Sequence, residues 1–182
     1  MKRFAKLLEN LLFTPSRNAK IIAMAEYFEN APDPDRGFAL GAITRELSLN
    51  NLKPTHLRTL TKSLVDPELF DMSYDYVGDM AETISLIWPK HTNRVLKKQR
   101  LPQLGELISA LQTKSKIALQ TYVTELLDCA SVTERWAIIK MVTGGLRVGV
   151  SARLAKSSLA EYSGKDLTCL LYTSDAADEW RS

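Results

Sequence analysis

The chain of 182 residues carries 24 basic and 21 acidic side chains, so its formal net charge is +3. This small surplus helps a protein approach phosphates but does not by itself indicate a nucleic-acid partner. About 45% of the residues are hydrophobic, which is enough for a sizeable core. The two cysteines, Cys129 and Cys169, form no disulfide or metal-binding pattern, so we expect reduced thiols in a cytoplasmic protein. No segment predicts a signal peptide or a membrane span.

Apolar residues recur with helical spacing from the start of the chain. A first helix is predicted by one buried face, which consists of Phe4, Leu7, Leu8, Leu11 and Leu12. The segment 14–16 ends this helix, and Ser16 is the expected N-cap of the next. Pro32 and Pro34 predict a turn, because proline disfavours helix in the residue before it. We expect a short helix over residues 36–44 to follow.

Prolines also mark the helices of the central segment. Pro54 suits the first turn of one helix, and Asp66 followed by Pro67 predicts the start of another. The longest apolar stripe predicts a single helix that Pro89 ends; its members are Val77, Met80, Ala81, Ile84 and Trp88. Residues 89–102 then hold six Lys, Arg or His side chains and no acid. That segment is either a solvated basic linker or a nucleic-acid contact.

Helical periodicity continues through the last third of the chain. Apolar stripes predict helices between residues 104 and 127, and Ser131 with Glu134 predicts a capping box for the next helix. A glycine pair near residue 144 would end that helix, and a last helix would span about 150–162. No strand alternation and no repeat of clear period appears. We therefore predict an all-α fold of about nine or ten helices, forming either one lobe or two lobes joined by the basic segment.

The most informative segment is KMVTGGLRVGVS, at residues 140–151. Gly144 and Gly145 let the backbone approach another surface without a Cβ in the way, and we expect the amides of this turn to be free to face a phosphate. A helix begins directly after them near Ser151, and its free N–H groups and positive dipole end suit a phosphate. Arg147 and Arg153 add permanent positive charge. From composition alone, a glycine C-cap followed by a turn with solvated arginines explains these residues more simply.

A second candidate segment is TPSRNAK, at residues 14–20. Its serine and amide groups stand at a predicted helix start, where they can cap the helix or bind phosphate. Arg17 and Lys20 would lie on one side of the first turn. Capping is the simpler interpretation of Ser16.

No segment carries a recognisable catalytic pattern. Asp75 and Asp79 have i, i+4 spacing, but no base, metal-ligand set or phosphate loop accompanies them. Acids at a helix N-terminus are the better interpretation of this pair. His56 and His91 are isolated, and the glycine-rich nucleotide-binding motifs and the nucleophile-elbow motif are absent from the sequence.

Four blocks of the sequence carry a family resemblance. FAKLLENLLFTPSRNAKIIAMAEYF, DPDRGFALGAI and SYDYVGDMAETISLIWP resemble the amino-terminal domain of bacterial ATP-dependent DNA ligases. KMVTGGLRVGVSARLAKSSLA resembles the G-x-L-R-[IVL]-G signature that closes this domain. The resemblance covers about residues 1–166 and implies that residues 1–167 form the helical DNA-binding domain of such a ligase.

The resemblance implies a domain that grips nicked double-stranded DNA in the minor groove, mostly through backbone contacts. Gly144 and Arg147 stand where the family places DNA-contacting residues, and Gly145 stands where some relatives carry a basic residue. Leu146 and Val148 are expected to anchor the loop to the core, and the G-D-x-A-E pattern from Gly78 is expected to be structural. The predicted DNA-binding residues are Gly144, Gly145, Arg147, Ser151, Arg153, Ser16, Arg17 and Lys20.

The chemistry of the family lies outside the resembling blocks. Its nucleophile is the lysine of a K-x-D-G motif, which reacts with ATP, and no K-x-D-G occurs in this sequence. We therefore expect no catalytic residue and no cofactor in this chain, and no nick sealing by the chain alone. The resemblance implies ATP, Mg²⁺ and the nucleotidyltransferase and OB-fold domains for a full-length, monomeric enzyme. It also implies that such an enzyme is cytoplasmic and associated with the nucleoid, and that it acts in DNA repair, replication or recombination.

The end of the chain departs from the family. The segment CLLYTSDAADEWRS resembles translated adapter sequence, so residues 168–182 are expected to be a non-native, disordered tail and the parent reading frame to be truncated. Two other functions stay open for the rest of the chain: a helical protein-interaction module without DNA binding, and a self-sufficient enzyme. Salt-sensitive binding to nicked duplex would favour the ligase interpretation over both.

Overall fold

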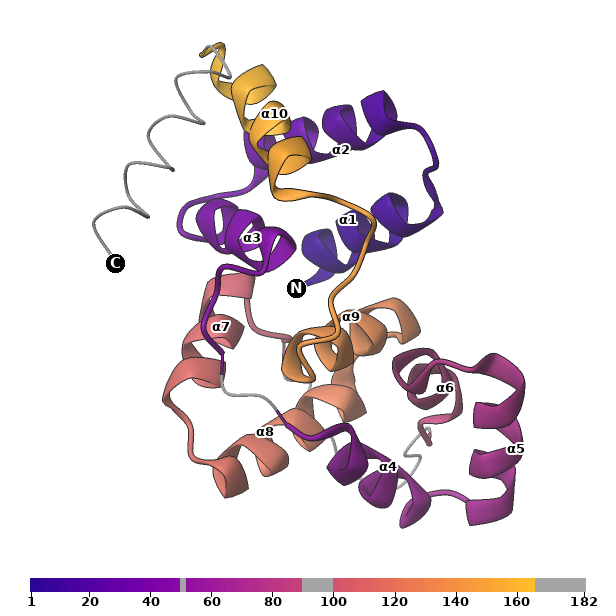
Figure 1. The fold of residues 1–182 in the computed structure, drawn as a ribbon. Coiled ribbons are helices and arrows are strands. Elements are labelled where there is room, and N and C mark those ends of the chain that lie inside the picture. The colour runs from indigo at the N-terminus through magenta and orange to yellow at the C-terminus, as the bar shows by residue number, and fades with distance from the viewer. Residues whose placement is uncertain (50–51, 90–99, 166–182) are drawn as a thin grey trace, which may run out of the picture. The chain divides into compact units, whose positions relative to one another are not determined.

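The computed structural model describes residues 1–49, 52–89 and 100–165, which form ten α-helices and no strand (Figure 1). The predicted all-α fold is therefore confirmed. The predictions for the basic residues 90–99 and for the tail lie outside the described residues. The helices are α1 (Lys2–Phe13), α2 (Arg17–Asn30), α3 (Asp35–Thr44), α4 (Pro54–Lys62), α5 (Pro67–Val77), α6 (Met80–Ile87), α7 (Leu104–Thr113), α8 (Lys116–Cys129), α9 (Val132–Val142) and α10 (Ala152–Ser163).

Side-chain caps fix where many of these helices begin. Ser16 accepts a hydrogen bond from the third residue of α2, and Asp66 caps α5 immediately before Pro67, as predicted. The predicted capping box between Ser131 and Glu134 is also present at the start of α9. Local sequence signals therefore set these helix starts.

The predicted single helix over residues 77–88 is wrong. α5 ends at Val77, Gly78 adopts a left-handed conformation with φ 75°, and Asp79 caps α6. Glycine enters this conformation without a Cβ penalty, so an apolar stripe can continue across a break in the helix. Asp79 is the expected N-terminal acid, whereas Asp75 lies in the last turn of α5 and does not fit that expectation.

The chain folds into two compact units. Of the described residues, unit 1 contains 1–6 and those between 48 and 146, and unit 2 contains 7–47 and 147–165. The helices on either side of the basic segment, α6 and α7, both belong to unit 1. The prediction that this segment joins two lobes is therefore wrong. Each unit combines stretches that are distant in the sequence, and local composition does not reveal such a division.

The two units repeat one helical path at a constant separation of 99 residues. α2 and α8 each contain 14 residues and begin after the N-cap serines Ser16 and Ser115. Further along each copy, Arg36 and Arg135 donate Nε–H to a backbone carbonyl eight residues earlier, in both cases at 2.6 Å. The expectation of no clear repeat is thus corrected. The identical residues that mark the duplication, such as Ser16 with Ser115 and Arg36 with Arg135, are scattered and lie far apart in the chain, so no short period reveals them.

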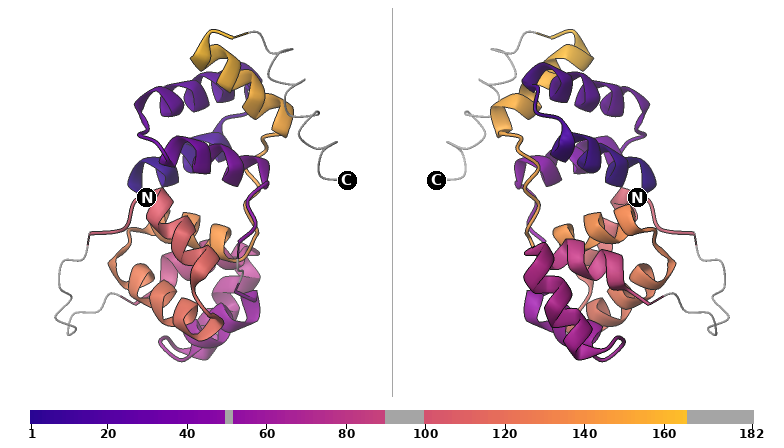
Figure 2. Two further views of the ribbon diagram at one scale, coloured as in Figure 1. Left: turned by 90° about the vertical axis from the view of Figure 1, so that its left-hand side faces the viewer. Right: turned by 90° about the vertical axis from the view of Figure 1, so that its right-hand side faces the viewer.

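Different packing completes each unit. In unit 2, α10 packs against α2 and α3 (Figure 2), and the rings of Phe28 and Tyr162 meet edge to face at 6.5 Å. In unit 1, the extra hairpin of α5 and α6 packs α6 against α9. The indole Nε1–H of Trp88, which follows α6, donates to Asp128 at 3.0 Å.

Candidate nucleic-acid interface

The glycine pair forms a turn on the surface of unit 1, after α9. Gly144 is exposed and adopts a left-handed conformation with φ 70°, and Leu146 is buried as predicted. The N–H of Gly144 donates to the carbonyl of Met141 at 3.2 Å, and the N–H of Gly145 donates to that of Lys140 at 2.9 Å. These bonds form a Schellman-type cap, which satisfies carbonyls left over at the helix end. The expectation that this turn frees its backbone amides for a phosphate is therefore wrong.

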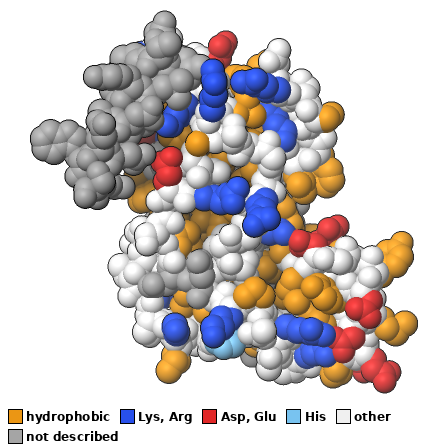
Figure 3. All heavy atoms as spheres, in the orientation of Figure 1, with side chains coloured by type: hydrophobic (Ala, Val, Ile, Leu, Met, Phe, Trp, Pro, Cys, Tyr) orange, Lys and Arg blue, Asp and Glu red, His pale blue; other side chains and the backbone are white. Residues whose placement is uncertain are grey.

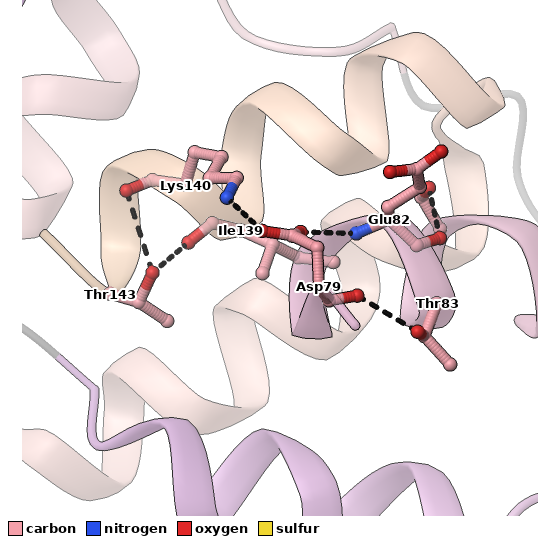
Figure 4. A network of polar contacts seen from close by, with 7 residues as sticks. Asp79, Glu82, Thr83, Ile139, Lys140 and Thr143 are labelled. Carbon is pink, nitrogen blue, oxygen red and sulfur yellow. Dashed lines mark hydrogen bonds and ion pairs between the residues drawn. The ribbon is translucent and has the colours of Figure 1, made fainter. Parts of the chain in front are cut away.

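A polar network within unit 1 holds the helix end before this turn (Figure 4). Lys140 of α9 forms an ion pair with Asp79, with 2.5 Å between Nζ and Oδ2. The other carboxylate oxygen of Asp79 accepts a hydrogen bond from the N–H of Glu82 at 2.9 Å, which caps α6. Burial raises the pKa of Asp79, but the bonds from Lys140 and the Glu82 N–H outweigh it, so the pKa lies below the ordinary 3.8. The predicted structural role of the G-D-x-A-E pattern agrees with this geometry.

Lys20 holds the loop that leads into α10 within unit 2. Its Nζ donates to the carbonyl oxygens of Val148 and Gly149, both at 3.0 Å, and the side chain is only 8% exposed. Gly149 has φ 64°, and a Cβ at this position would lie 2.8 Å from the Lys20 ammonium. The predicted set treats Lys20 as a phosphate contact. Its geometry instead makes it a clamp that sets the path of the loop.

The other predicted residues of unit 2 lie on its surface. Ser16 and Ser151 cap α2 and α10 by accepting hydrogen bonds from the third residue of each helix. Arg17, Arg147 and Arg153 are exposed, and no ion pair of theirs occurs in the described part of the chain. Each helix start still has N–H groups that its serine does not take up, and these carry the positive end of the helix dipole. Phosphate oxygens are suitable acceptors for both kinds of donor.

The charge along this part of the sequence has one sign. From residue 143 to residue 160 there are three Lys or Arg side chains, Arg147, Arg153 and Lys156, and no Asp or Glu. Blue Lys and Arg side chains gather on the face of unit 2 in the upper part of Figure 3. A local surplus of this kind attracts a polyanion although the whole chain carries a net charge of only +3.

The predicted residues divide between the two units. Gly144 and Gly145 belong to unit 1, and the other six belong to unit 2, where Lys20 links the first turn of α2 to the loop before α10. Gly149 is missing from the predicted set, although its place in the same glycine-rich segment could have pointed to it. The clamp itself has no local signal, because Lys20 and Gly149 are 129 residues apart.

Other kinds of site find no support among the described residues. No group of three or more His, Cys, Asp or Glu side chains there is arranged to hold a metal ion. A search of the same residues finds no helix with the length and apolar character of a membrane span. A cleft of about 390 Å³ lies between α4 and α8 and brings together His56 and mostly apolar or hydroxyl side chains. It contains no predicted site residue.

Comparison with known proteins identifies the family of this helical chain. A family profile described as "DNA ligase N terminus" matches residues 1–160, which include all eight predicted site residues and most of both units. A comparison with curated proteins gives no match. The profile spans most of the 182 residues, so the chain belongs to the DNA ligase N-terminal domain family.

Proposed function

We propose that this chain is a DNA-binding domain that grips the sugar-phosphate backbone of nicked duplex DNA for an ATP-dependent DNA ligase. The observation that carries the proposal is the loop clamped by Lys20. It fixes the backbone between Arg147 and Ser151, so an exposed guanidinium and a capped helix start are held at defined positions. Preorganised donors bind an anion without the entropy cost of ordering the loop.

The proposed contacts are to phosphates rather than to bases. Arg147, Arg153 and Arg17 supply charge and planar donors, and the first turns of α2 and α10 supply N–H groups. None of these groups distinguishes one sequence from another when it binds the backbone. The exposed, Cβ-free Gly144 lets a sugar-phosphate strand approach the turn of unit 1 closely. The amides of Gly144 and Gly145 bond to carbonyls of α9 and do not serve as phosphate donors, but the space left by the missing Cβ remains.

The catalytic functions of the proposed enzyme would come from other domains of a longer polypeptide. ATP and Mg²⁺ would bind there, and the present domain would contribute affinity for the nick in repair, replication or recombination. The bacterial origin and the nucleoid location implied by the resemblance belong to the same proposal.

Fluorescence anisotropy with labelled nicked duplex tests this proposal. The dissociation constant is measured at several salt concentrations for the wild type, for Arg147→Ala and for Arg58→Ala. Arg147→Ala should weaken binding to every sequence and reduce the slope of log K against log salt by roughly one. Arg58→Ala is the control, because the Arg58 guanidinium is already paired with Asp71 at 2.7 Å. An Arg147→Ala variant that binds with the wild-type affinity and slope would remove Arg147 from the interface.

A second candidate function is a protein-interaction module. It is favoured by an exposed apolar stripe on α5, where Leu69, Met72 and Tyr76 follow i, i+3, i+7 spacing and are 54–93% exposed. The same titration separates the two functions. A module of this kind would show no salt-dependent binding to nicked duplex at either low or moderate salt.

A further inference from the structure

The turn after α3 in unit 2 copies the glycine turn of unit 1 bond for bond. Thr44 Oγ1 donates to Leu40 O at 3.0 Å, as Thr143 Oγ1 donates to Ile139 O at 2.7 Å. The next two N–H groups also form matching pairs. Arg45 N donates to Ala42 O at 3.3 Å, and the equivalent Gly144 N donates to Met141 O at 3.2 Å. Glu46 N donates to Gly41 O at 3.0 Å, and the equivalent Gly145 N donates to Lys140 O at 2.9 Å. Every corresponding pair is 99 residues apart, so the two turns are equivalent positions of one duplicated motif.

Arg45 occupies the left-handed position that glycine takes in the other copy. Its φ is 63° and its ψ is 27°, and it is the only non-glycine residue with positive φ in the described part of the chain. A residue with a Cβ is disfavoured in this conformation relative to glycine, because the Cβ comes too close to the backbone. The fold therefore tolerates a strained arginine where the equivalent turn shows that glycine fits. Such strain is a reason to look for a function of the side chain.

The Arg45 side chain has no structural role that would explain this strain. It is exposed, and within the described residues its guanidinium takes part in no ion pair and no hydrogen bond. The turn is held without it, by the backbone bonds and by Leu47, whose side chain packs against the Cα of Gly41. A permanently charged, planar donor set thus stands on this turn with no hydrogen-bond or ion-pair partner among the described residues of its unit.

We propose that the turn at residues 44–47 is a second contact for the nucleic-acid backbone, in which Arg45 binds a phosphate of duplex DNA. This inference rests on the proposed function. A phosphodiester backbone presents the same anionic group at every nucleotide on both strands, so a duplicated turn finds the same ligand chemistry twice. Arginine suits this ligand because its fork donates two parallel hydrogen bonds to phosphate oxygens. In the other copy the charge stands three residues later, at Arg147, and Gly144 takes the equivalent position.

The neighbouring Glu46 is exposed and opposes a phosphate at this turn. Its carboxylate lowers the local positive potential without removing the directional bonds of Arg45. Replacing it provides an independent test with the opposite sign. Glu46→Gln should tighten binding to duplex DNA if a phosphate lies at the turn, and should have no effect if none does.

Arg45→Gly separates binding from folding, because glycine relieves the backbone strain while it removes the guanidinium. Thermal unfolding should place this variant at or above the wild-type stability. Anisotropy with nicked duplex should show weaker binding and a salt slope reduced by roughly one. Arg45→Lys keeps the charge without the fork and should keep the wild-type slope with an intermediate affinity.

The outcomes distinguish this inference from the proposed function. If the wild type does not bind nicked duplex, both are overturned. If Arg147→Ala loses affinity and slope while Arg45→Gly and Glu46→Gln both match the wild type, the inference is overturned and the proposed function stands. If Arg45→Gly loses affinity with an unchanged slope, the turn acts only through its shape and the phosphate contact is overturned.

Discussion

Units 1 and 2 use the same helical path but hold equivalent turns by different chemistry. In unit 1 the last turn of α9 carries Lys140, which reaches across to the partly buried carboxylate of Asp79. The equivalent position in unit 2 is Gly41, where a Cβ would lie only 3.0 Å from the Leu47 side chain. An ion pair supports one turn, and an apolar contact against a bare Cα supports the other. The duplicated feature is therefore the backbone geometry of the turn, and the side chains around it have diverged.

The largest effect is expected from replacing the two equivalent arginines, Arg36 and Arg135. Their comparison tests whether burial or the number of hydrogen bonds determines how much each arginine stabilises the fold. Arg135 is 9% exposed and among the described residues donates only to Leu127 O, whereas Arg36 donates to Phe28 O and to Ala31 O. Arg36 also pairs with an exposed carboxylate and stacks on an aromatic ring, yet its side chain is 26% exposed. We expect Arg135→Met to cost about 2 kcal/mol, because it leaves a buried carbonyl unsatisfied. Arg36→Met should cost about 1 kcal/mol, because water can replace part of what is lost.

Urea unfolding of the two variants measures this difference. The methionine keeps most of the apolar stem, so the comparison isolates the guanidinium from packing. Equal losses, or a larger loss for Arg36→Met, would mean that the number of contacts outweighs burial. The stability difference between the two arginines would then follow from their contacts and not from their burial.

The Lys20 clamp distinguishes unit 2 further, and Gly149→Ala tests it. The substitution places a side chain in a left-handed conformation and puts its Cβ against the Lys20 ammonium, which two hydrogen bonds hold in place. We expect a loss of about 1–2 kcal/mol in the free energy of unfolding. Gly78→Ala is a matched control, since its φ of 75° is similar and no atom lies within 4 Å of the new Cβ.

The loss of unfolding free energy should be larger for Gly149→Ala than for Gly78→Ala, and the difference measures the contact with Lys20. A double-mutant cycle with Lys20→Met should show coupling between positions 20 and 149, because both substitutions disturb one interaction. Additive effects would argue against the clamp. Binding of nicked duplex by Gly149→Ala should weaken without a change in salt slope, because no phosphate contact is removed.

Local signals predicted most helices but not the relation between the units. Caps at Ser16, Asp66 and Ser131 depend on residues three apart, so they can be read directly from the sequence. The break at Gly78 was hidden because an apolar stripe continues through it. The duplication was hidden because left-handed turns and carbonyl bonds can be made by Arg45 and by Gly144 alike.

The sequence predicted which residues of the candidate site are exposed or cap a helix, but not which hydrogen bonds they form. Exposed arginines and cap serines stand where the segments at residues 14–20 and 140–151 place them. Lys20 was taken for a phosphate contact because its partners are far away in the sequence and appear only in the folded unit. The glycine amides were expected to be free because the sequence does not show which helix carbonyls they satisfy.

The smallest effect is expected from Asp79→Asn. This substitution measures how much the ion pair stabilises the turn of unit 1, where unit 2 has an apolar contact instead. Asp79→Asn removes the charge opposite Lys140 and keeps a good N-cap, so the pair is tested apart from the cap. The carboxylate is 37% exposed, so solvent screening limits the expected loss to about 1 kcal/mol near neutral pH.

The pH dependence of this loss identifies the ion pair. Because the folded-state pKa of Asp79 lies below its ordinary 3.8, the stabilisation is fully present well above pH 3.8 and is lost as the pH falls through the folded-state value. The stability difference between the wild type and Asp79→Asn should therefore be constant from about pH 5 to pH 7 and shrink below about pH 4. A difference that persists unchanged to pH 2 would assign the loss to amide packing instead of charge. Unit 2 has glycine at the position of Lys140, so its turn should contribute no such acid-dependent term.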